Sequence, residues 1–293
     1  MKPSAFGYSR PESVAEAIAA LAEAGPDGKV LAGGQSLVPL LSMRLAAPSH
    51  LVDINRLTEL SYISVADGQV RIGALARHAE VLRDPAVAAA APLISDALAL
   101  VAHPVIRNRG TTVGSIVHAD PAGEMTAVLA LLGGSVRLAG TGGERLVKAE
   151  DFFLGPLESD VQPGELATEA IFPVLASRVG GAFAEVSRRS GDYAICGVAA
   201  LAQIDEDGRL VRARAAYLSV AGTPLVIDLS DACSGTASDD DVLAAAGRLA
   251  AGSVRPVSDI HATAAYRSHL AGVLTRRALA EAVAQARRRA RDI

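Results

Sequence analysis

The fold is decided by the stretch Lys29-Val-Leu-Ala-Gly-Gly-Gln-Ser-Leu37, in which a short apolar strand runs directly into two glycines. Glycine adopts positive φ at no steric cost, and its missing side chain lets backbone N–H groups come close to a ligand. The apolar residues 37–45 predict a helical segment after this loop, and a helix N-terminus adds partial positive charge. The loop therefore suits a pyrophosphate, although it has neither the Gly-x-Gly-x-x-Gly nor the Gly-Lys-Ser/Thr pattern. Taken alone, an ordinary strand-to-helix turn is the alternative.

A second loop of small residues reads Arg109-Gly-Thr-Thr-Val-Gly-Ser115. The hydroxyl groups of Thr111, Thr112 and Ser115 can donate hydrogen bonds to phosphate oxygens without steric bulk. Two such loops on two α/β subdomains are more telling than one, so we expect a dinucleotide with its pyrophosphate in the cleft between them. The spacing of Ser, His, Asp and Cys residues indicates no catalytic triad and no metal site, which leaves the chemistry to a bound cofactor.

Two carboxylates follow the second loop. Asp120 and Glu124 lie within one or two helical turns of it, where they could accept hydrogen bonds from ribose or ring donors. The alternative is that Asp120 caps a helix predicted over 123–132, with Glu124 favourable in the first turn. Both interpretations can hold for the same residues.

The composition excludes several classes of function. The chain has 293 residues, a length typical of two domains, and 50% of them are hydrophobic. Only 3% are aromatic, which argues against clefts built from stacked aromatic rings. The net charge of −4 does not suggest a nucleic-acid partner. We interpret the basic residues 287–291 as the C-terminal end of a helix, where cations complement the helix dipole.

The sequence predicts no membrane span and no targeting segment. No apolar run reaches the roughly 20 residues that a span needs, and no basic region followed by an apolar stretch opens the chain. The two cysteines, Cys196 and Cys233, allow at most one disulfide and cannot form a four-thiolate zinc or iron–sulfur site. We therefore expect a reduced, cytoplasmic protein.

The periodicity of apolar residues predicts the remaining elements and a change of pattern near residue 175. Helices are expected over 13–24, 78–83, 85–102, 123–132, 239–251 and 259–290. Strands are expected over 29–32, 51–54, 62–65, 69–73, 135–139, 164–173, 182–186, 193–204 and 209–220. The strand 164–173 is predicted to lie at a sheet edge because Pro173 ends it, and Asp67-Gly68 predicts a hairpin turn.

The two loops resemble the two FAD-binding motifs in the flavoprotein (medium) subunit of molybdenum hydroxylases. That family includes carbon monoxide dehydrogenase and the xanthine dehydrogenase relatives. The resemblance is carried by Ala32-Gly-Gly-Gln-Ser36, by 107–121, and by Leu51-Val-Asp-Ile-Asn55, Ile72-Gly-Ala-Leu-Ala-Arg-His-Ala-Glu80, Asp151-Phe-Phe153, Pro163-Gly-Glu-Leu166 and Arg188-Arg-Ser-Gly-Asp-Tyr-Ala-Ile195. These motifs are in register across residues 1–200, and the last third is similar in size and in its order of strands and helices.

The resemblance implies an α+β chain of two domains. Residues 1–175 would form a two-subdomain FAD-binding domain of the vanillyl-alcohol-oxidase (PCMH) type, with subdomains over 1–56 and 57–175. Residues 176–293 would form the flavoprotein C-terminal domain, a three-stranded antiparallel sheet with helices.

The resemblance also implies the residues that hold FAD. The pyrophosphate would lie against both loops, Asp120 and Glu124 would lie near the cofactor, and the Tyr193 ring would approach the flavin. The complete expected set is Ala32, Gly33, Gly34, Gln35, Ser36, Thr111, Thr112, Val113, Gly114, Ser115, Asp120, Glu124 and Tyr193. No catalytic residue and no metal ligand is expected on this chain.

By the same resemblance, the chain would be one part of a larger enzyme. A molybdenum large subunit would oxidise the substrate, and an iron–sulfur small subunit with [2Fe-2S] clusters would pass electrons to this FAD. The flavin would then deliver them to an external electron acceptor. A stand-alone flavin oxidoreductase of the same fold, or a non-catalytic scaffold that has lost flavin, are the alternatives.

Three positions depart from the family pattern. Val113 stands where the second loop commonly has a glycine, and a β-branched residue would be strained at positive φ. Ala167 stands where the family often has a second leucine after Gly-Glu-Leu, so one apolar contact is smaller here. Glu185 falls where some relatives have lysine, so a cation near the cofactor is missing. Either the loop does not need positive φ at Val113, or flavin binds differently there.

Overall fold

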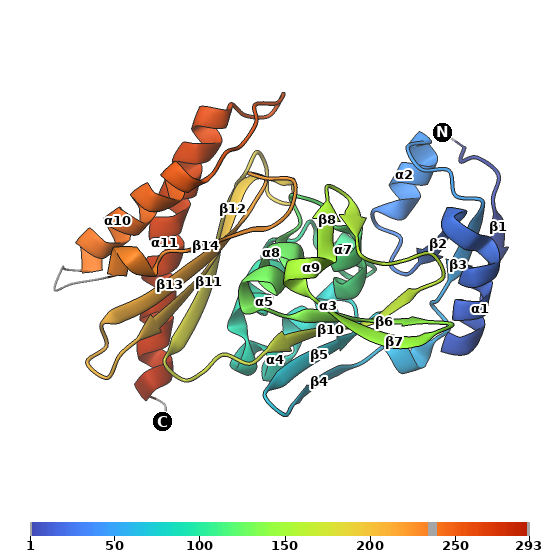
Figure 1. Ribbon diagram of the computed structural model, residues 1–293, viewed down its shortest axis with the longest axis horizontal. Coiled ribbons are helices and arrows are strands. Elements are labelled where there is room, and N and C mark those ends of the chain that lie inside the picture. Colours follow the sequence, from blue (N-terminus) through green and yellow to red (C-terminus); the bar gives the residue numbers. More distant parts are fainter. Residues whose placement is uncertain (1, 234–238, 292–293) are drawn as a thin grey trace.

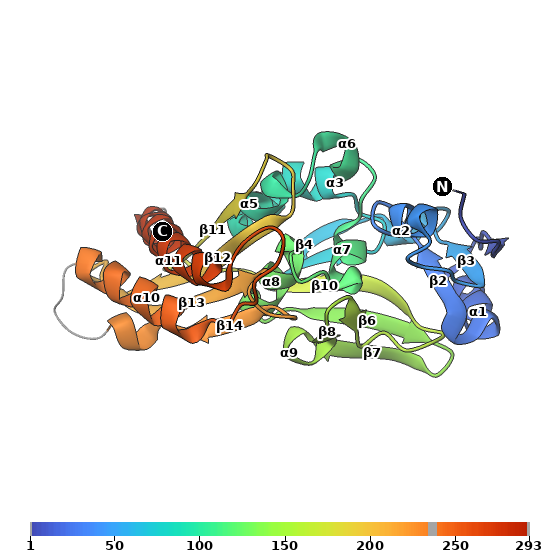
Figure 2. The same cartoon turned by 90° about the horizontal axis from the view of Figure 1, so that it is seen from above.

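Three units stand in a row in the computed structural model, which describes residues 2–233 and 239–291 (Figures 1 and 2). The first is a small parallel sheet with the strand order β1-β3-β2. Its elements are β1 (Gly7–Ser9), α1 (Val14–Ala24), β2 (Gly28–Leu31), α2 (Leu37–Met43) and β3 (His50–Asp53). The predicted helix and two strands are confirmed, whereas β1, only three residues long, was missed.

Local chemistry fixes the bounds of α1. Its N-cap is Ser13, whose hydroxyl accepts a hydrogen bond from the Glu16 N–H at 3.2 Å. The helix ends at Gly25, which adopts φ +64°. Ala17 and Leu21, four residues apart, are buried on the face toward the sheet.

The second unit is an antiparallel sheet with the order β4-β5-β10-β6-β7. Its strands are β4 (Ile63–Ala66), β5 (Gln69–Gly73), β6 (Ser135–Gly140), β7 (Gly143–Lys148) and β10 (Leu166–Pro173). Asp67 and Gly68 both have positive φ, as the hairpin prediction requires. The prediction that 164–173 is an edge strand was wrong, because β10 is central and buried through Phe172. Pro173 closes the strand at its exposed end, where the missing N–H costs little.

Helices pack on this sheet and connect its strands. They are α3 (His78–Arg83), α4 (Pro85–Ala90), α5 (Pro92–Leu100), α6 (Pro104–Arg107), α7 (Thr112–His118), α8 (Glu124–Leu132) and α9 (Ala149–Phe152), followed by the short pair β8 (Phe153–Gly155) and β9 (Glu158–Ser159). The single helix predicted over 85–102 was wrong. Pro92 excludes helical backbone at Ala91, which has φ −146° and ψ 70°, so the segment breaks into two helices.

The third unit is a four-stranded antiparallel sheet covered by two long helices. Its elements are β11 (Val179–Ser187), β12 (Ala194–Ile204), β13 (Leu210–Leu218), β14 (Leu225–Asp228), α10 (Asp239–Ser253) and α11 (Ala264–Arg291). The predicted count of three strands was wrong, because β14 has only four residues and follows the turn-like Gly222-Thr-Pro224. The order of strands followed by helices is confirmed.

The third unit is joined to the second by side-chain packing and by hydrogen bonds. Alternating residues of β12 pack into two different cores, with Ala199 and Leu201 toward the second unit and Val198 and Ala200 toward α11. The Ser219 N–H donates to the Pro121 carbonyl at 2.8 Å, just before α8. The C-terminal sheet therefore holds the start of α8 in place.

Candidate functional site: two crossing glycine loops

The two loops singled out by the sequence cross each other in direct contact. A Cβ added to Gly33 would lie 2.5 Å from the Arg109 carbonyl oxygen, 2.8 Å from the Gly110 Cα and 3.0 Å from the Thr111 nitrogen. Such distances leave no room for any side chain at position 33. The crossing joins the end of β2 in the first unit to the segment before α7 in the second.

A cavity of about 680 Å³ opens beside this crossing. Gly34 lines it with φ +71°, a conformation that favours glycine, and the Gln35 side chain donates to the Gly33 carbonyl at 2.9 Å. Of the residues expected to hold the cofactor, the cavity is lined by Ala32, Gly33, Gly34 and Gln35, whereas Ser36 occupies the N-cap of α2 and is not part of the wall.

Three arginines, Arg10, Arg77 and Arg109, also line the cavity. With the backbone of the first loop they make one wall suited to a diphosphate, because guanidinium is the side-chain group that best matches phosphate geometry. Arg77 lies in one of the motifs that carry the family resemblance, but no role was predicted for it. The signal that could have found it is its place directly after the buried segment 72–76.

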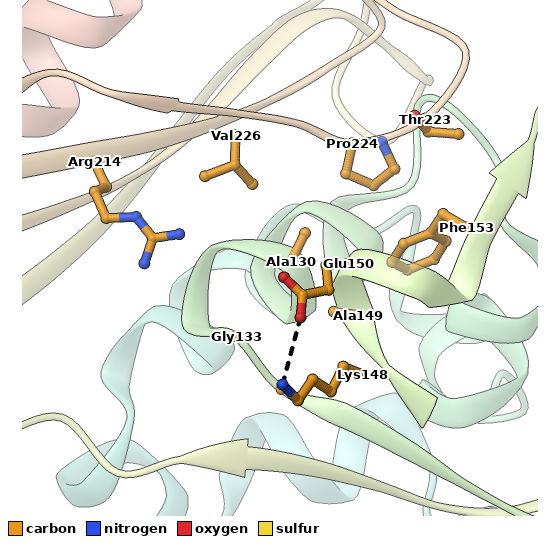
Figure 3. A pocket seen from close by; sticks show the side chains of 11 residues that line it. Ala130, Gly133, Lys148, Ala149, Glu150, Phe153, Arg214, Thr223, Pro224 and Val226 are labelled. Atoms are coloured by element: carbon orange, nitrogen blue, oxygen red, sulfur yellow. Dashed lines mark hydrogen bonds and ion pairs between the residues drawn. The ribbon is translucent and has the colours of Figure 1, made fainter. Parts of the chain in front are cut away.

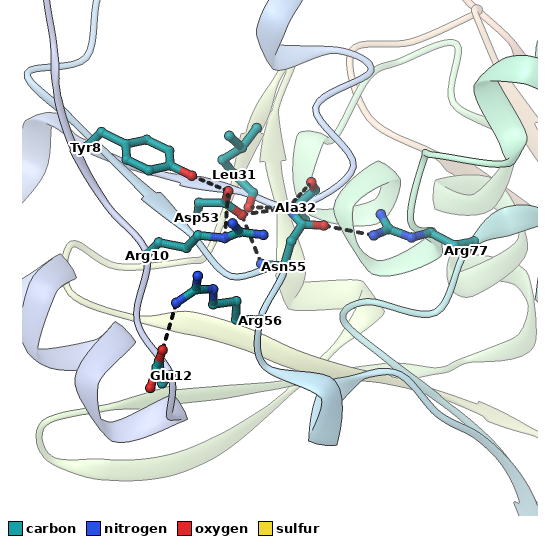
Figure 4. A network of polar contacts seen from close by, with 9 residues as sticks. All are labelled: Tyr8, Arg10, Glu12, Leu31, Ala32, Asp53, Asn55, Arg56 and Arg77. Atoms are coloured by element: carbon teal, nitrogen blue, oxygen red, sulfur yellow. Dashed lines mark hydrogen bonds and ion pairs between the residues drawn. The ribbon is translucent and has the colours of Figure 1, made fainter.

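A network of polar contacts runs along the floor of the same cavity (Figure 4). Asp53 at the end of β3 accepts hydrogen bonds from the Tyr8 hydroxyl at 2.5 Å and from the Asn55 N–H at 2.9 Å. The Arg10 Nε lies 3.7 Å from the same carboxylate. Burial alone would raise the pKa of Asp53, but these hydrogen bonds and the nearby cation hold it below the usual range. Asp53 is therefore an ionised anchor for the first loop.

In the second loop, Thr111, Thr112 and Val113 are buried. Thr111 is the N-cap of α7, and its hydroxyl accepts from the Gly114 N–H at 3.2 Å. Thr112 is fully buried, with its hydroxyl 3.2 Å from His78 Nδ1. Burial lowers the pKa of His78 to about 4, so this imidazole is neutral. The structure therefore places Thr111 and Thr112 in internal bonds, while Gly114 and Ser115 are partly exposed.

Val113 lies within α7 and is 2% exposed. It is absent from the described residues that have positive φ. The loop therefore does not need a glycine conformation there, and Val113 packs into the core of the second unit rather than facing a ligand. This removes the steric reason for supposing that the chain has lost its cofactor.

Acidic groups and a tyrosine gather at the other end of α7. The buried side chain of Glu124 has a pKa raised to about 8 by burial, with Glu185 and Asp120 adding to the effect. Burial also raises the pKa of Glu185 to about 7, and one of its carboxyl oxygens is buried without a partner. Partial desolvation and the carboxyls of Asp120 and Glu124 raise the pKa of Tyr193, whose side chain is 69% exposed. The structure thus brings Asp120, Glu124, Glu185 and Tyr193 close together.

The interpretation of Asp120 as the cap of the helix was wrong. Its carboxylate accepts from the Ala122 N–H at 2.8 Å, within the turn that precedes α8. The N-cap of α8 is Gly123, which has no capping side chain. Proline at position 121 and the turn around it move the carboxylate away from the first helical N–H groups.

A second cavity, of about 450 Å³, lies at the opposite end of α8 (Figure 3). Its wall includes Gly133, Lys148, Phe153 and Arg214, and none of the expected site residues. In the described ranges no group of His, Cys, Asp and Glu could hold a metal ion, and both cysteines are buried and free. Of these two cavities, only the first is lined by residues that were expected to hold the cofactor.

Comparison with known proteins decides the family. Residues 4–175 match the family model described as "FAD binding domain in molybdopterin dehydrogenase", and residues 181–282 match that of the "CO dehydrogenase flavoprotein C-terminal domain". The chain belongs to this flavoprotein family. It is an FAD-binding subunit of an oxidoreductase. The resemblance of the two loops to this family is therefore confirmed.

Several relatives match over almost their full length. The chain is 41% identical to the 6-hydroxypseudooxynicotine dehydrogenase complex subunit alpha of Paenarthrobacter nicotinovorans, covering 98% of this chain and 97% of that one. The structure of quinoline 2-oxidoreductase from Pseudomonas putida 86 superposes with a TM-score of 0.92 at 39% identity, covering 98% and 99% of the two chains. Carbon monoxide dehydrogenase from Hydrogenophaga pseudoflava gives 0.92 at 36% identity, covering 97% and 99%.

The residues present fit FAD. The crossing at Gly33 and the positive φ of Gly34 form a side-chain-free cradle, and the three arginines that line the cavity bring positive charge to suit a diphosphate. α7 has seven residues, so it spans about 10 Å between the cradle and the Glu124 cluster. An extended dinucleotide can lie along α7, from the cavity at the first loop to the Glu124 cluster.

Proposed function

We propose that the chain holds FAD along the line from the first glycine loop to Tyr193 and carries electrons from an iron–sulfur subunit to an external acceptor. A molybdenum subunit of the same complex would oxidise the substrate. The observation that carries the proposal is the crossing of the two loops at Gly33, beside a cavity lined by three arginines.

Each part of the site has a separate role in this proposal. The backbone of Gly33, Gly34 and Gln35 binds the pyrophosphate, with Ala32 and Ser36 at the two ends of that loop. The segment Thr111–Ser115 packs against the first loop and supports it. Gly114 and Ser115 are its partly exposed residues, whereas Val113 is part of the hydrophobic core. Asp120, Glu124 and Tyr193 border the ring end of the cofactor. Bound FAD supplies the electron transfer itself.

The proposed partners follow from what this chain lacks and from its relatives. Two buried cysteines provide no ligand set for an iron–sulfur cluster, so the clusters must belong to another chain. One relative is a subunit of a dehydrogenase complex, and others are medium chains of carbon monoxide dehydrogenase. We place the molybdenum cofactor and the [2Fe-2S] clusters on a large and a small subunit.

The domain division is part of the same proposal. Residues 1–175 would be the FAD-binding domain, with subdomains 1–56 and 57–175, and residues 176–293 the flavoprotein C-terminal domain. We place the complex in the cytoplasm, where cysteines stay reduced. In the described parts of the chain, no helix has the length and apolar character to cross a membrane.

The proposal is tested with the purified chain, by visible absorption before and after adding FAD and removing the excess. We expect flavin bands and about one FAD released per chain on denaturation. Co-expression with the iron–sulfur and molybdenum subunits should then give a complex in which oxidation of the substrate reduces the flavin through the clusters. A folded chain that refuses FAD, alone and in the complex, would contradict the proposal, and substrate oxidation by the single chain would contradict the division of labour.

A further inference from the structure

A bridge of two side chains connects the glycine loops, one from each subdomain (Figure 4). Asn55 follows β3 in the first unit, and Arg77 precedes α3 in the second. The Asn55 amide nitrogen donates to the Ala32 carbonyl at 2.9 Å and to the Asp53 carboxylate at 2.6 Å. The Asn55 amide oxygen accepts from Arg77 Nη2 at 2.8 Å. The first loop is thereby bonded to Arg77.

Arg77 also bonds the second loop. Its Nη1 donates to the Arg109 carbonyl oxygen at 2.6 Å. This oxygen is the same atom that lies 2.5 Å from a Cβ built on Gly33. The guanidinium therefore holds the second loop at the point where the two loops cross, and Thr111 pairs with the Arg77 backbone in an isolated β-bridge.

The chemistry of the bridge depends on both residue types. An asparagine amide carries donors and an acceptor on one group, so Asn55 can bind the Ala32 carbonyl and Arg77 together. A guanidinium is a rigid planar fork with donors in different directions, whereas a lysine ammonium is a point charge on a flexible stem. Only the fork can reach Asn55 and the Arg109 carbonyl at once.

We propose that Asn55 and Arg77 are positioning residues that fix the two glycine loops relative to each other and thereby set the affinity for FAD. The inference rests on the proposed function, because it concerns the same cavity. A cradle already in its binding geometry loses less conformational freedom when the ligand binds. The competing explanation is that Arg77, which lines the cavity, acts only as a positive charge near the phosphates.

The test compares FAD dissociation constants of the full chain, measured by flavin absorbance, for the wild type, Arg77→Lys, Arg77→Gln and Asn55→Ala. All three variants should bind FAD about tenfold more weakly or worse. The double variant Asn55→Ala with Arg77→Lys should be little weaker than the worse single variant, because both break one bridge. The loss in Arg77→Lys should persist at high salt, where an exposed charge effect is screened.

Arg56→Gln is the matched control. Arg56 is exposed, pairs with Glu12 at 2.7 Å and lies next to Asn55 in the chain, so its replacement removes a charge without touching the bridge. Its FAD affinity should equal that of the wild type. Thermal unfolding without FAD is followed for every variant, and Asn55→Ser is the milder replacement if Asn55→Ala does not fold.

The outcomes separate the two proposals. If Arg77→Lys binds FAD as tightly as the wild type while Arg77→Gln does not, Arg77 acts through its charge and the bridge is overturned. The bridge would also be overturned if the losses of FAD affinity in the two single variants added up in the double variant. The same holds if FAD affinity fell only in proportion to the unfolding temperature. A wild-type chain that binds no FAD would instead overturn the proposed function itself, and the bridge with it.

Discussion

The two glycine loops are both rich in small residues, yet their side chains have different surroundings in the structure. Ala32, Gly33 and Gly34 are partly exposed, and they line a cavity. Thr112 and Val113 are at most 2% exposed, and their side chains contact His78 and the core. The first loop thus forms part of the cavity surface and is held in place by side chains. The second loop is largely buried, and the first loop packs against it. Small residues therefore serve close approach in one loop and tight packing in the other.

The largest expected effect comes from filling the crossing. Gly33→Val places carbon atoms within 2.5 Å of the Arg109 carbonyl, so one loop must move away from the other. FAD affinity should fall about 100-fold or more, the equivalent of roughly 3 kcal/mol. The measurement is a titration with FAD followed by absorbance. Gly142→Val is the control, because a Cβ at that position meets nothing within 4 Å. Equal affinity in Gly33→Val and wild type would show that the crossing is not part of the site.

Val113→Gly should separate stability from binding in the second loop. The change removes a buried side chain and adds backbone freedom within α7, so the free energy of unfolding should fall by about 2–4 kcal/mol. FAD affinity of the folded chain should stay within about threefold, because Val113 does not face the cavity. Chemical denaturation and FAD titration measure the two quantities. A large gain in FAD affinity would mean that the loop needs a glycine after all.

Thr112→Val is a smaller test of the same loop. The replacement keeps the shape and removes the hydroxyl that contacts His78 Nδ1, so about 1 kcal/mol of stability should be lost. FAD binding should not change. Ser115→Ala, on the partly exposed part of the loop, is the contrasting variant and should weaken FAD more than it affects unfolding. The reverse ranking would contradict the assignment of the two residues.

The last prediction concerns pH and the Glu124 cluster. The folded chain holds the pKa of Glu124 at about 8, above the value of about 4.3 in an unfolded chain. The stability contributed by protonated Glu124 is complete below pH 4 and is lost as the pH rises toward 8. Glu124→Gln should therefore unfold at a higher temperature than the wild type at pH 9, by roughly 2–4 °C for each 1 kcal/mol recovered. At pH 5 the two should be nearly equal.

Thermal scans of the chain without FAD, at both pH values, measure this difference. Glu59→Gln, at an exposed position, is the control and should show no pH-dependent gain. A Glu124→Gln variant that loses stability equally at pH 5 and pH 9 would show that Glu124 is ionised in the folded chain.

Much of the site could be predicted from local sequence. The glycine pair after a strand predicted the loop that lines the cavity, and the resemblance gave the cofactor. The exposure of each residue could not be predicted, because α7 begins at Thr112 and turns Thr112 and Val113 inward. Asn55 and Arg77 were missed because their roles depend on a contact between residues 22 positions apart in different subdomains. The central place of β10 was missed for a similar reason, since strand order is set by pairing across the whole second unit.

The central claim is that the first loop meets the cofactor and the second supports it. Amide hydrogen exchange of the chain with and without FAD tests it most directly. We expect residues 33–37 to gain the largest protection on adding FAD, while 111–113, already buried, change little. Unchanged exchange at 33–37 in a chain that has bound FAD, or protection confined to 111–113, would contradict the account.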